Sequence, residues 1–335
     1  MADADLRVRT SAQPGYSANT LSIDPEEQMA TRAAWLYFVS GLTQVQIGKR
    51  LGINRIRVNR LLAFARDEGL VQINITGRLA NCVDLEERLK TYYGLDDAIV
   101  VPTPPDQDMV PQVIATAAGA ALTERLRDGL SVGVGWGRTL RLSLQSVPRR
   151  PLKRLSVVSL LGGLTRGAAM NPHETASHLA DLVDAQCYYV AAPALTDTQT
   201  TRDILIAQPM LREVFDRGSR VDLAFLSVGE LTHTNTMSRV GLVSRTDVEE
   251  LLAAGAAGDI CAHWINDEGH LVDHPLNSRA VALPPDRLRD IPCVMIASGG
   301  KAKTPVLRGV LKGGMADVVI TDEQTAKAVL AMEGV

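Results

Sequence analysis

Aromatic residues are scarce in this 335-residue chain, at 4% of the total, and so is cysteine. The sequence has no run of about 18 apolar residues and no apolar segment near its start, so we expect neither a membrane span nor a signal peptide. The widely spaced cysteines argue against a disulfide framework or a zinc site and favour reduced core thiols in a cytoplasmic protein. They are Cys82, Cys187, Cys261 and Cys293.

The composition suits a large core, since 46% of the residues are apolar and Ala, Val, Leu and Gly dominate. The length predicts about two domains of ~150 residues each. Residues 1–25 are polar and lack periodicity, so we expect a disordered arm there, followed by one domain over 26–80 and another over 84–335. The net charge of −3 excludes a uniformly basic protein, although it allows a locally basic one.

Helical stretches and short apolar runs alternate through residues 84–335, which is typical of a mostly parallel sheet with helices on both faces. The predicted fold class is therefore α/β with a doubly wound, mostly parallel sheet. Strands are predicted at 98–101, 131–135, 155–161, 187–193, 221–229, 259–265, 292–298 and 316–321, with a tight turn at 266–270. Helices are predicted at 84–93, 110–127, from 139, 173–183, 202–216, 246–254, 303–312 and after 322.

Residues 26–67 predict three short helices. The first ends at Gly41, and Thr43 and Asn54 are good N-caps for the other two. Gly52 fits the left-handed position after the second helix. Alternating residues at 70–76 predict a strand, either a wing or a connector. The side chains expected inside are Ala30, Ala33, Ala34, Leu36, Val45, Ile47, Leu51, Val58, Leu61, Leu62 and Ala65.

The stretch GLTQVQIGKRLGINRIRVNRLL, residues 41–62, has five basic residues and no acidic one. Two helices joined by a glycine-containing turn form a helix-turn-helix, whose second helix enters the major groove of DNA. A solvated hairpin is the alternative, but the caps, apolar spacing and acid-free outer face together favour binding to a polyanion. The residues expected at the DNA are Thr43, Gln44, Lys49, Arg50, Asn54, Arg55, Arg57, Asn59 and Arg60.

Residues 41–75 resemble the N-terminal module of the SorC family of bacterial sugar-responsive regulators, sometimes grouped with DeoR-like deoxyribonucleoside regulators. Family members usually have Ser at the position of Asn54 and often at that of Asn59. Asn caps a helix as well as Ser does, so this departure concerns base preference rather than fold. The resemblance implies double-stranded operator DNA as a partner and a homo-oligomer, a tetramer built from dimers.

Three glycine-bearing segments follow predicted strands, namely 132–140 (VGVGWGRTL), 160–167 (LLGGLTRG) and 297–326, which begins ASGGKAK. Loops at the carboxyl ends of parallel strands form the usual ligand crevice of an open α/β sheet. If the loops share that edge, Arg138, Thr139 and Lys303 converge on one pocket suited to a phosphate, a carboxylate or a polyhydroxyl compound. Each loop alone is also compatible with a simple packing turn.

These loops and GAAGDI, residues 255–260, are similar to the SorC-family effector domain, which resembles ribose-5-phosphate isomerase and glucosamine-6-phosphate deaminase in fold. The likeness covers about residues 30–330 and implies a small sugar, polyol or sugar-phosphate effector, with no cofactor. Phosphosugar binders often have a Gly-Thr-Thr type loop where this chain has 136–139, so a free polyol or ketose is an alternative, as in repressors of sugar-alcohol (erythritol-type) operons. The effector residues expected are Gly135, Trp136, Gly137, Arg138, Thr139, Gly162, Gly163, Asp259 and Lys303.

Purely structural roles are alternatives for single residues. Asp259 could cap or pair with a nearby group, Lys303 could simply begin a helix, and Trp136 could serve only to pack the core. We expect a DNA-binding transcriptional regulator, most simply a repressor relieved by its effector. The alternative is a sugar-phosphate isomerase or deaminase with an added helical module. The chain lacks the dense acidic motif of such enzymes. His173 and His178 are five residues apart, which suits a shared metal ion poorly.

Overall fold

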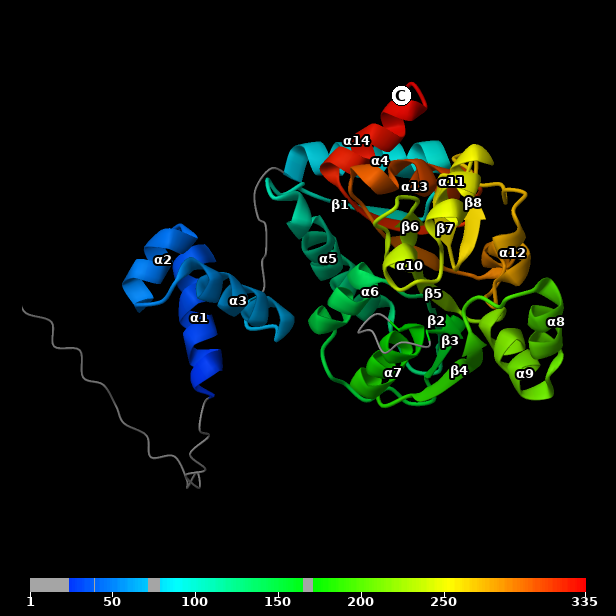
Figure 1. Cartoon of the computed structure of the whole chain (residues 1–335), viewed down its shortest axis with the longest axis horizontal. Coiled ribbons are helices and arrows are strands. Elements are labelled where there is room, and N and C mark those ends of the chain that lie inside the picture. The colour runs from blue at the N-terminus through cyan, green and yellow to red at the C-terminus, as the bar shows by residue number, and fades with distance from the viewer. Residues whose placement is uncertain (1–23, 39, 72–78, 165–170) are drawn as a thin grey trace, which may run out of the picture. The chain divides into compact units, whose positions relative to one another are not determined.

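The computed structural model describes residues 24–38, 40–71, 79–164 and 171–335. The chain divides into two compact units, Met1–Gln72 and Ile73–Val335, each considered by itself below (Figure 1). Nearly all of the expected arm at 1–25 and most of the predicted strand at 70–76 lie outside the described residues, while Leu70 and Val71 belong to no strand. No helix within the described ranges is long and apolar enough to cross a membrane.

Three helices form the N-terminal unit, as predicted: α1 (Pro25–Phe38), α2 (Gln44–Leu51) and α3 (Arg55–Asp67). The Thr43 side chain accepts the N–H of Gln46, while the Gln46 side chain accepts the N–H of Thr43. This reciprocal capping box satisfies two otherwise unpaired donors at the start of α2. The Asn54 side chain accepts the N–H of Arg57 at 2.8 Å and starts α3 in the same way. The two predicted N-caps are confirmed.

The core of this unit is built from small and branched residues of all three helices. The four predicted positions of α1 and the four of α3 are buried, as is Ile47 of α2. Val45 is 52% exposed, so the prediction that it faces inward is wrong. Residues two apart on a helix point about 200° away from each other, so Val45 and Ile47 cannot share the inner face. The outer face of α2 therefore carries an apolar side chain.

A seven-stranded parallel sheet forms the second unit, which we call the body, in the order β1-β10-β9-β5-β2-β3-β4. The doubly wound α/β class is therefore confirmed. The strands are β1 (Asp97–Val101), β2 (Ser131–Val134), β3 (Ser156–Gly163), β4 (Gln186–Pro193), β5 (Leu223–Leu226), β9 (Val294–Ala297) and β10 (Val318–Asp322). A separate antiparallel sheet contains β6 (Val228–Glu230), β7 (Gly258–Ile260) and β8 (His263–Ile265).

Both faces of the parallel sheet are covered by helices, so its central strands are mostly apolar. In β5, Leu223 and Phe225 face a cluster with α5, α6 and α7, while Ala224 and Leu226 face one with α4, α11, α13 and α14. The helices of the body are α4 (Leu79–Tyr93), α5 (Val110–Arg125), α6 (Arg138–Ser143), α7 (Pro172–Val183), α8 (Gln199–Ala207), α9 (Pro209–Gly218), α10 (Thr236–Arg239), α11 (Arg245–Ala253), α12 (Pro275–Arg279), α13 (Thr304–Lys312) and α14 (Glu323–Met332).

Two predicted strands are each divided in the structure. The apolar run 221–229 contains β5 and then β6, which leaves the parallel sheet for the antiparallel one. The run 259–265 is a hairpin of β7 and β8, because Cys261 and Ala262 both have positive φ, at 49° and 57°. Two successive positive φ values are typical of the tightest hairpin turn, which usually contains Asn or Gly. The following turn at 266–270 is confirmed, with the Asn266 N–H donating to the His270 carbonyl.

The helix predicted at 202–216 is two helices, α8 and α9, which meet at Pro209. Proline lacks the N–H that a continuous helix needs, and it keeps the preceding residue out of helical conformation. Gln208 accordingly has φ −62° and ψ 132°. Helices α8 and α9 pack against the rest of the body through a small separate apolar cluster around Val190, Leu211 and Val281.

An ionic cluster around the buried Arg308 joins α4, α13, the turn at 266–270 and the chain beyond α14. Arg308 of α13 is 9% exposed, and its guanidinium contacts Asp267 and Glu268 at 2.8 Å and Glu333 at 2.5 Å. The Tyr92 hydroxyl of α4 donates to Glu333 at 2.9 Å. Because removing Arg308 or Glu333 would leave a buried charge uncompensated, this cluster holds the four segments together.

We expect Gly52→Ala to destabilise the N-terminal unit by about 1 kcal/mol, because Gly52 has φ +69° and an alanine is strained there. No atom would touch the added methyl group, so the effect is conformational. Amide hydrogen exchange in α2 and α3 should quicken about fivefold. Gly52→Asn is the matched control and should have a smaller effect, since asparagine tolerates this conformation. Equal exchange in the two variants would contradict the explanation.

Candidate functional site

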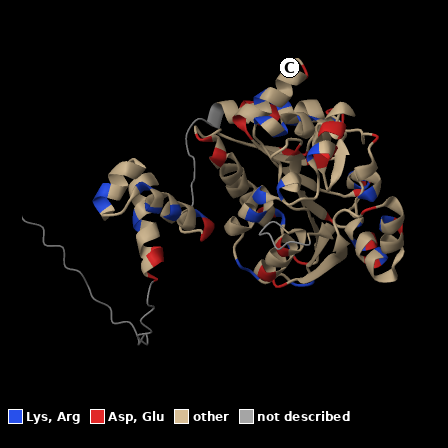
Figure 2. Cartoon of the chain, in the orientation of Figure 1, with Lys and Arg blue, Asp and Glu red and all other residues tan. Residues whose placement is uncertain are grey.

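The exposed face of α3 is the candidate DNA-contacting surface. Ile56, Asn59, Arg60 and Ala63 recur at helical spacing opposite the buried stripe of α3. Lys and Arg gather on this unit, while acidic residues lie at the start of α1 and at the end of α3 (Figure 2). Within the described residues, Lys49, Arg50 and Arg60 form no ion pair. These cations are therefore available for phosphates or base edges.

Side-chain hydrogen bonds connect α2 to the start of α3. Gln44 donates to the side-chain oxygen of Asn59 at 2.6 Å and accepts from Arg55 Nε at 3.2 Å. Gln44 therefore orients two residues predicted to contact DNA. Arg57 instead pairs with Glu26 of α1 at 2.9 Å and lies at the flank of the α3 face. Thr43 and Asn54 are exposed caps at the amino ends of α2 and α3.

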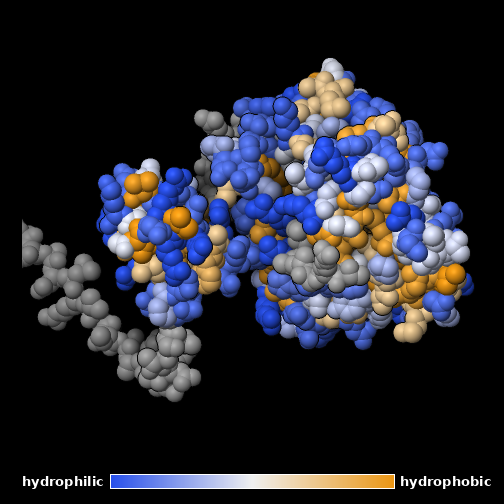
Figure 3. All heavy atoms as spheres, in the orientation of Figure 1, coloured by the Kyte–Doolittle hydropathy of each residue, from blue (hydrophilic) through white to orange (hydrophobic). Residues whose placement is uncertain are grey.

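Sequence reasoning missed one residue of this surface. Ile56 is 67% exposed at the centre of the α3 face, among the polar residues predicted to contact DNA. Exposed apolar patches are visible on the helical unit in Figure 3. An exposed isoleucine on such a face is a candidate for contact with the methyl group of thymine. Its place directly after Arg55 in the sequence was the available signal. A prediction restricted to polar side chains misses it.

A cavity of about 160 Å³ in the body, which we call the ligand cavity, brings together loops that follow neighbouring strands. Trp136 to Thr139 follow β2, Ser227 to Glu230 follow β5, and Lys303 follows β9. The strand order reverses between β2 and β5, since β3 and β4 lie on one side and β9 and β10 on the other. Ligands of open α/β sheets bind at such a switch point, so the cavity lies where a site is expected.

Six of the nine residues predicted for the effector line this cavity: Trp136, Gly137, Arg138, Thr139, Asp259 and Lys303. Trp136 and Thr139 are buried, and Arg138 is exposed. Gly135 does not line the cavity; its N–H donates to the Phe225 carbonyl.

The two glycines that end β3 lie elsewhere. A side chain at Gly162 would collide with carbonyl oxygens of β4, and one at Gly163 with the ring of His173. Both glycines therefore allow close packing between neighbouring elements, and among the described residues they do not line the ligand cavity. The rest of that loop, 165–170, lies outside the described residues.

Three of the five ionisable groups that line the ligand cavity interact with one another. Asp259 is 7% exposed, and its carboxylate accepts the N–H of Ala262 at 3.3 Å. Burial raises the pKa of Asp259 to about 7; the Ala262 hydrogen bond and Lys303 oppose this rise, and Glu230 adds to it. Lys303 Nζ is 3.7 Å from Glu230 Oε2, and both side chains are 23% exposed. The cavity thus combines hydrogen-bond acceptors with a cation.

Sequence reasoning missed the residues that the segment after β5 contributes. Glu230 follows the turn from β5 into β6, and Asn235 and Arg239 belong to the segment around α10. Asn235 is buried and its side chain caps Ser238, so its role is partly structural. The predicted strand 221–229 ends at this edge of the sheet, which was the available signal. The switch of β6 into a second sheet concealed it.

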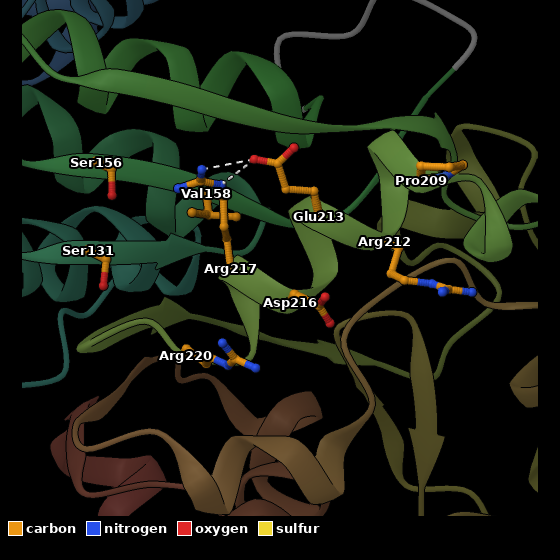
Figure 4. A pocket seen from close by; sticks show the side chains of 9 residues that line it. All are labelled: Ser131, Ser156, Val158, Pro209, Arg212, Glu213, Asp216, Arg217 and Arg220. Atoms are coloured by element: carbon orange, nitrogen blue, oxygen red, sulfur yellow. Dashed lines mark hydrogen bonds and ion pairs between the residues drawn. The ribbon is translucent and has the colours of Figure 1, made fainter.

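A larger cavity of about 560 Å³ lies at the opposite end of the sheet, where β2 and β3 begin at Ser131 and Ser156 (Figure 4). Its arginines come from α9 and the residues just after it. Arg217 pairs with Glu213 at 2.9 Å and its guanidinium lies 4.3 Å from the Tyr188 ring centre. Size alone does not select a site, and the amino ends of parallel strands are not the usual ligand edge.

Metal binding finds no support in the described part of the chain, where no group of three or more His, Cys, Asp and Glu residues could hold an ion. Cys82 and Cys261 are buried, while Cys187 and Cys293 are partly buried. Burial raises the pKa of the Cys261 thiol to about 12, so this thiol is unreactive at neutral pH.

Comparison with known proteins finds similarity over most of the chain. Residues 77–331 match the family described as "Putative sugar-binding domain". The erythritol catabolism regulatory protein EryD of Brucella abortus is 34% identical over 92% of this chain and 98% of its own length. The deoxyribonucleoside regulator of Bacillus subtilis is 28% identical over 91% of this chain and 98% of its own. The full-length sorbitol operon regulator SorC of Klebsiella pneumoniae shares the fold, with a TM-score of 0.69, 23% identity and coverage of 91% and 99%.

The raised pKa of Asp259 predicts a specific dependence of stability on pH. A carboxyl group whose pKa is higher in the folded chain takes up a proton on folding, so its contribution to the free energy of unfolding falls as pH rises from 3.8 to about 7. Asp259→Asn keeps an acceptor for Ala262 but cannot ionise. In urea unfolding it should therefore gain stability relative to wild type between pH 4 and pH 8, by up to roughly 4 kcal/mol at ~1.4 kcal/mol per tenfold change in proton affinity.

Asp108→Asn, at an exposed carboxyl group outside the ligand cavity, is the matched control and should differ from wild type equally at both pH values. A constant difference between wild type and Asp259→Asn would show that the buried carboxyl group does not titrate in this range.

Proposed function

Because the chain belongs to the SorC/DeoR-type family of sugar-binding transcriptional regulators, we propose that it controls a sugar or polyol catabolic operon in the cytoplasm. The chain is a regulator, not an enzyme. One observation carries the proposal. The same chain contains a basic helix-turn-helix and, at the switch point of a parallel sheet, a cavity lined by Arg138, Asp259 and Lys303.

The DNA-binding part of the proposal rests on the exposed face of α3. Asn59 and Arg60 would contact base edges, with Asn59 held by Gln44, and Ile56 would contact a thymine methyl group. Lys49 and Arg50 at the end of α2 suit phosphates. Helix-turn-helix proteins usually bind two-fold sites as dimers, so we propose a homodimer or a tetramer built from dimers.

The effector part of the proposal rests on the ligand cavity. Its volume of about 160 Å³ is below the ~300–1,000 Å³ of pockets for drug-sized compounds, so the effector is small. Asp259 and Glu230 would accept hydrogen bonds from hydroxyl groups, and Lys303 would donate to them. Trp136 would supply an apolar wall against the carbon chain. Relatives named for erythritol, sorbitol and deoxyribonucleosides support a sugar or polyol.

Regulation follows from linkage between the two sites. An effector that binds one arrangement of the oligomer more tightly shifts the population toward it, and DNA affinity changes by the same coupling free energy. We propose that the protein is a repressor and that effector binding releases the DNA.

A thermal-shift screen of the whole chain tests the effector class. The panel contains erythritol, sorbitol and ribose, with their phosphate esters and terminal carboxylic acids. A true effector stabilises the fold by mass action, by ~2.7 kcal/mol at a hundred times its dissociation constant. If no compound of the panel raises the melting temperature, the proposed effector class is wrong.

We expect Arg60→Ala and Asn59→Ala to weaken binding to the preferred genomic fragment about 10- to 100-fold, because each removes a base contact. Fluorescence anisotropy against that fragment and against random duplex at moderate salt measures the effect. Binding to random duplex should change much less. Arg245→Ala, at an 81% exposed arginine of the body, is the matched control and should leave both affinities unchanged. Equal loss on both duplexes would argue against base contacts.

We expect Lys303→Ala to leave DNA affinity intact but to weaken the effector response about tenfold or more, because the cavity loses its partly buried cation. The measurement is release of the genomic fragment as a function of effector concentration. Lys301→Ala, two residues earlier and outside the cavity, is the matched control. An unchanged dose–response curve for Lys303→Ala would remove this residue from the site.

A further inference from the structure

We propose that Glu230 makes the ligand cavity select an uncharged polyhydroxyl compound over the phosphate ester or carboxylate of the same carbon skeleton. The inference rests on the proposed function and narrows the chemical class of its effector. Glu230 ends β6 and lines the cavity, and its carboxylate is 3.7 Å from the ammonium group of Lys303.

Lys303 is the least exposed of the three cations that line the ligand cavity, at 23%. An unpaired ammonium group in that position would attract an anionic ligand. Glu230, exposed to the same extent, already supplies the opposite charge from within the chain. A ligand anion would therefore have to compete with Glu230 for Lys303, whereas a hydroxyl group can donate to Glu230 and accept from Lys303 at once.

Asp259 adds a second acidic group beside Glu230. In the antiparallel sheet Glu230 pairs with Gly258, and Gly229 pairs with Asp259. The Asp259 side chain lies against β6 so closely that any side chain at Gly229 would collide with it. Glu230 thus compensates the charge of Lys303, and Asp259 adds a negative charge whenever it is ionised, so this end of the cavity offers no net positive charge to an anion.

Arg138 and Arg239 also line the ligand cavity, but both are exposed to solvent. Salt and water screen exposed charges strongly, so these arginines attract an anion less than the partly buried Glu230 repels it. Arg138 begins α6, which has only six residues and therefore adds little attraction for an anion. The cavity is also small, so an anion anywhere inside it lies within the ~8 Å screening length of Glu230.

Titration calorimetry of the whole chain with matched compounds tests the inference. The pairs are erythritol with erythronate, sorbitol with gluconate, and ribose with ribonate, together with the phosphate esters. Wild type should bind the neutral member of a pair about tenfold or more tightly than the anion. Glu230→Gln keeps the shape and hydrogen-bonding capacity but removes the charge, so the ratio of the two affinities should fall by about tenfold or more.

Glu249→Gln is the matched control, since Glu249 is exposed on α11, pairs with Arg245 and does not line the ligand cavity. It changes the net charge equally and should leave the ratio at its wild-type value. If Glu230 were only structural, Glu230→Gln would weaken both members of a pair alike. Should Glu230→Gln fail to fold, Glu230→Ser removes the same charge with a smaller side chain, and the same ratio decides.

The outcomes separate this inference from the proposed function. If wild type binds a neutral compound and the ratio is unchanged in Glu230→Gln, the inference alone is wrong. If wild type prefers the carboxylates or phosphate esters, the inference is also wrong, while the sugar-responsive regulator stands. If wild type binds no compound of the panel, the proposed effector class fails and the inference with it.

Discussion

The common direction of the seven strands in the main sheet determines where this protein can hold a ligand. Parallel strands end at one edge, and the reversal of strand order between β2 and β5 leaves that edge open at one point. The antiparallel β6-β7-β8 sheet, inserted along the chain between β5 and β9, brings Glu230 and Asp259 there. Lys303 arrives from the loop after β9. Segments distant in sequence thus supply opposite charges to one small volume.

Much of this arrangement follows from local patterns that tertiary structure does not override. Strands buried on both faces appear as apolar runs, and Thr43 and Asn54 are caps because of their chemistry. Lys303 is predicted from the loops at the carboxyl ends of the strands, and Asp259 from the family resemblance alone. The β7–β8 hairpin escaped prediction because Cys261 and Ala262 adopt positive φ without Gly or Asn. Glu230 escaped because nothing in the sequence marks the point where β6 leaves one sheet for another.

The two units differ in how their charged side chains are paired. On the helical unit, the described residues provide no acidic partner for Lys49, Arg50 and Arg60. These cations can therefore pair with the negative charges of a bound polyanion. In the ligand cavity the chain pairs Lys303 with Glu230 and keeps Asp259 buried with a raised pKa. A site whose charges are mostly compensated internally recognises a ligand through directed hydrogen bonds instead. The net charge of the chain reveals neither feature.

The ionic cluster at Arg308 has a mechanical consequence. The short turn that carries Lys303 continues directly into α13, and Arg308 lies one helical turn further on. Its contacts with Glu268 and Glu333, and that of Glu333 with Tyr92, fasten α13 to α4, the first described helix after the junction with the helical unit. Displacing α13 alone would strand buried charges at a cost of several kcal/mol. A displacement of α13 that kept these contacts would have to move α4 with it.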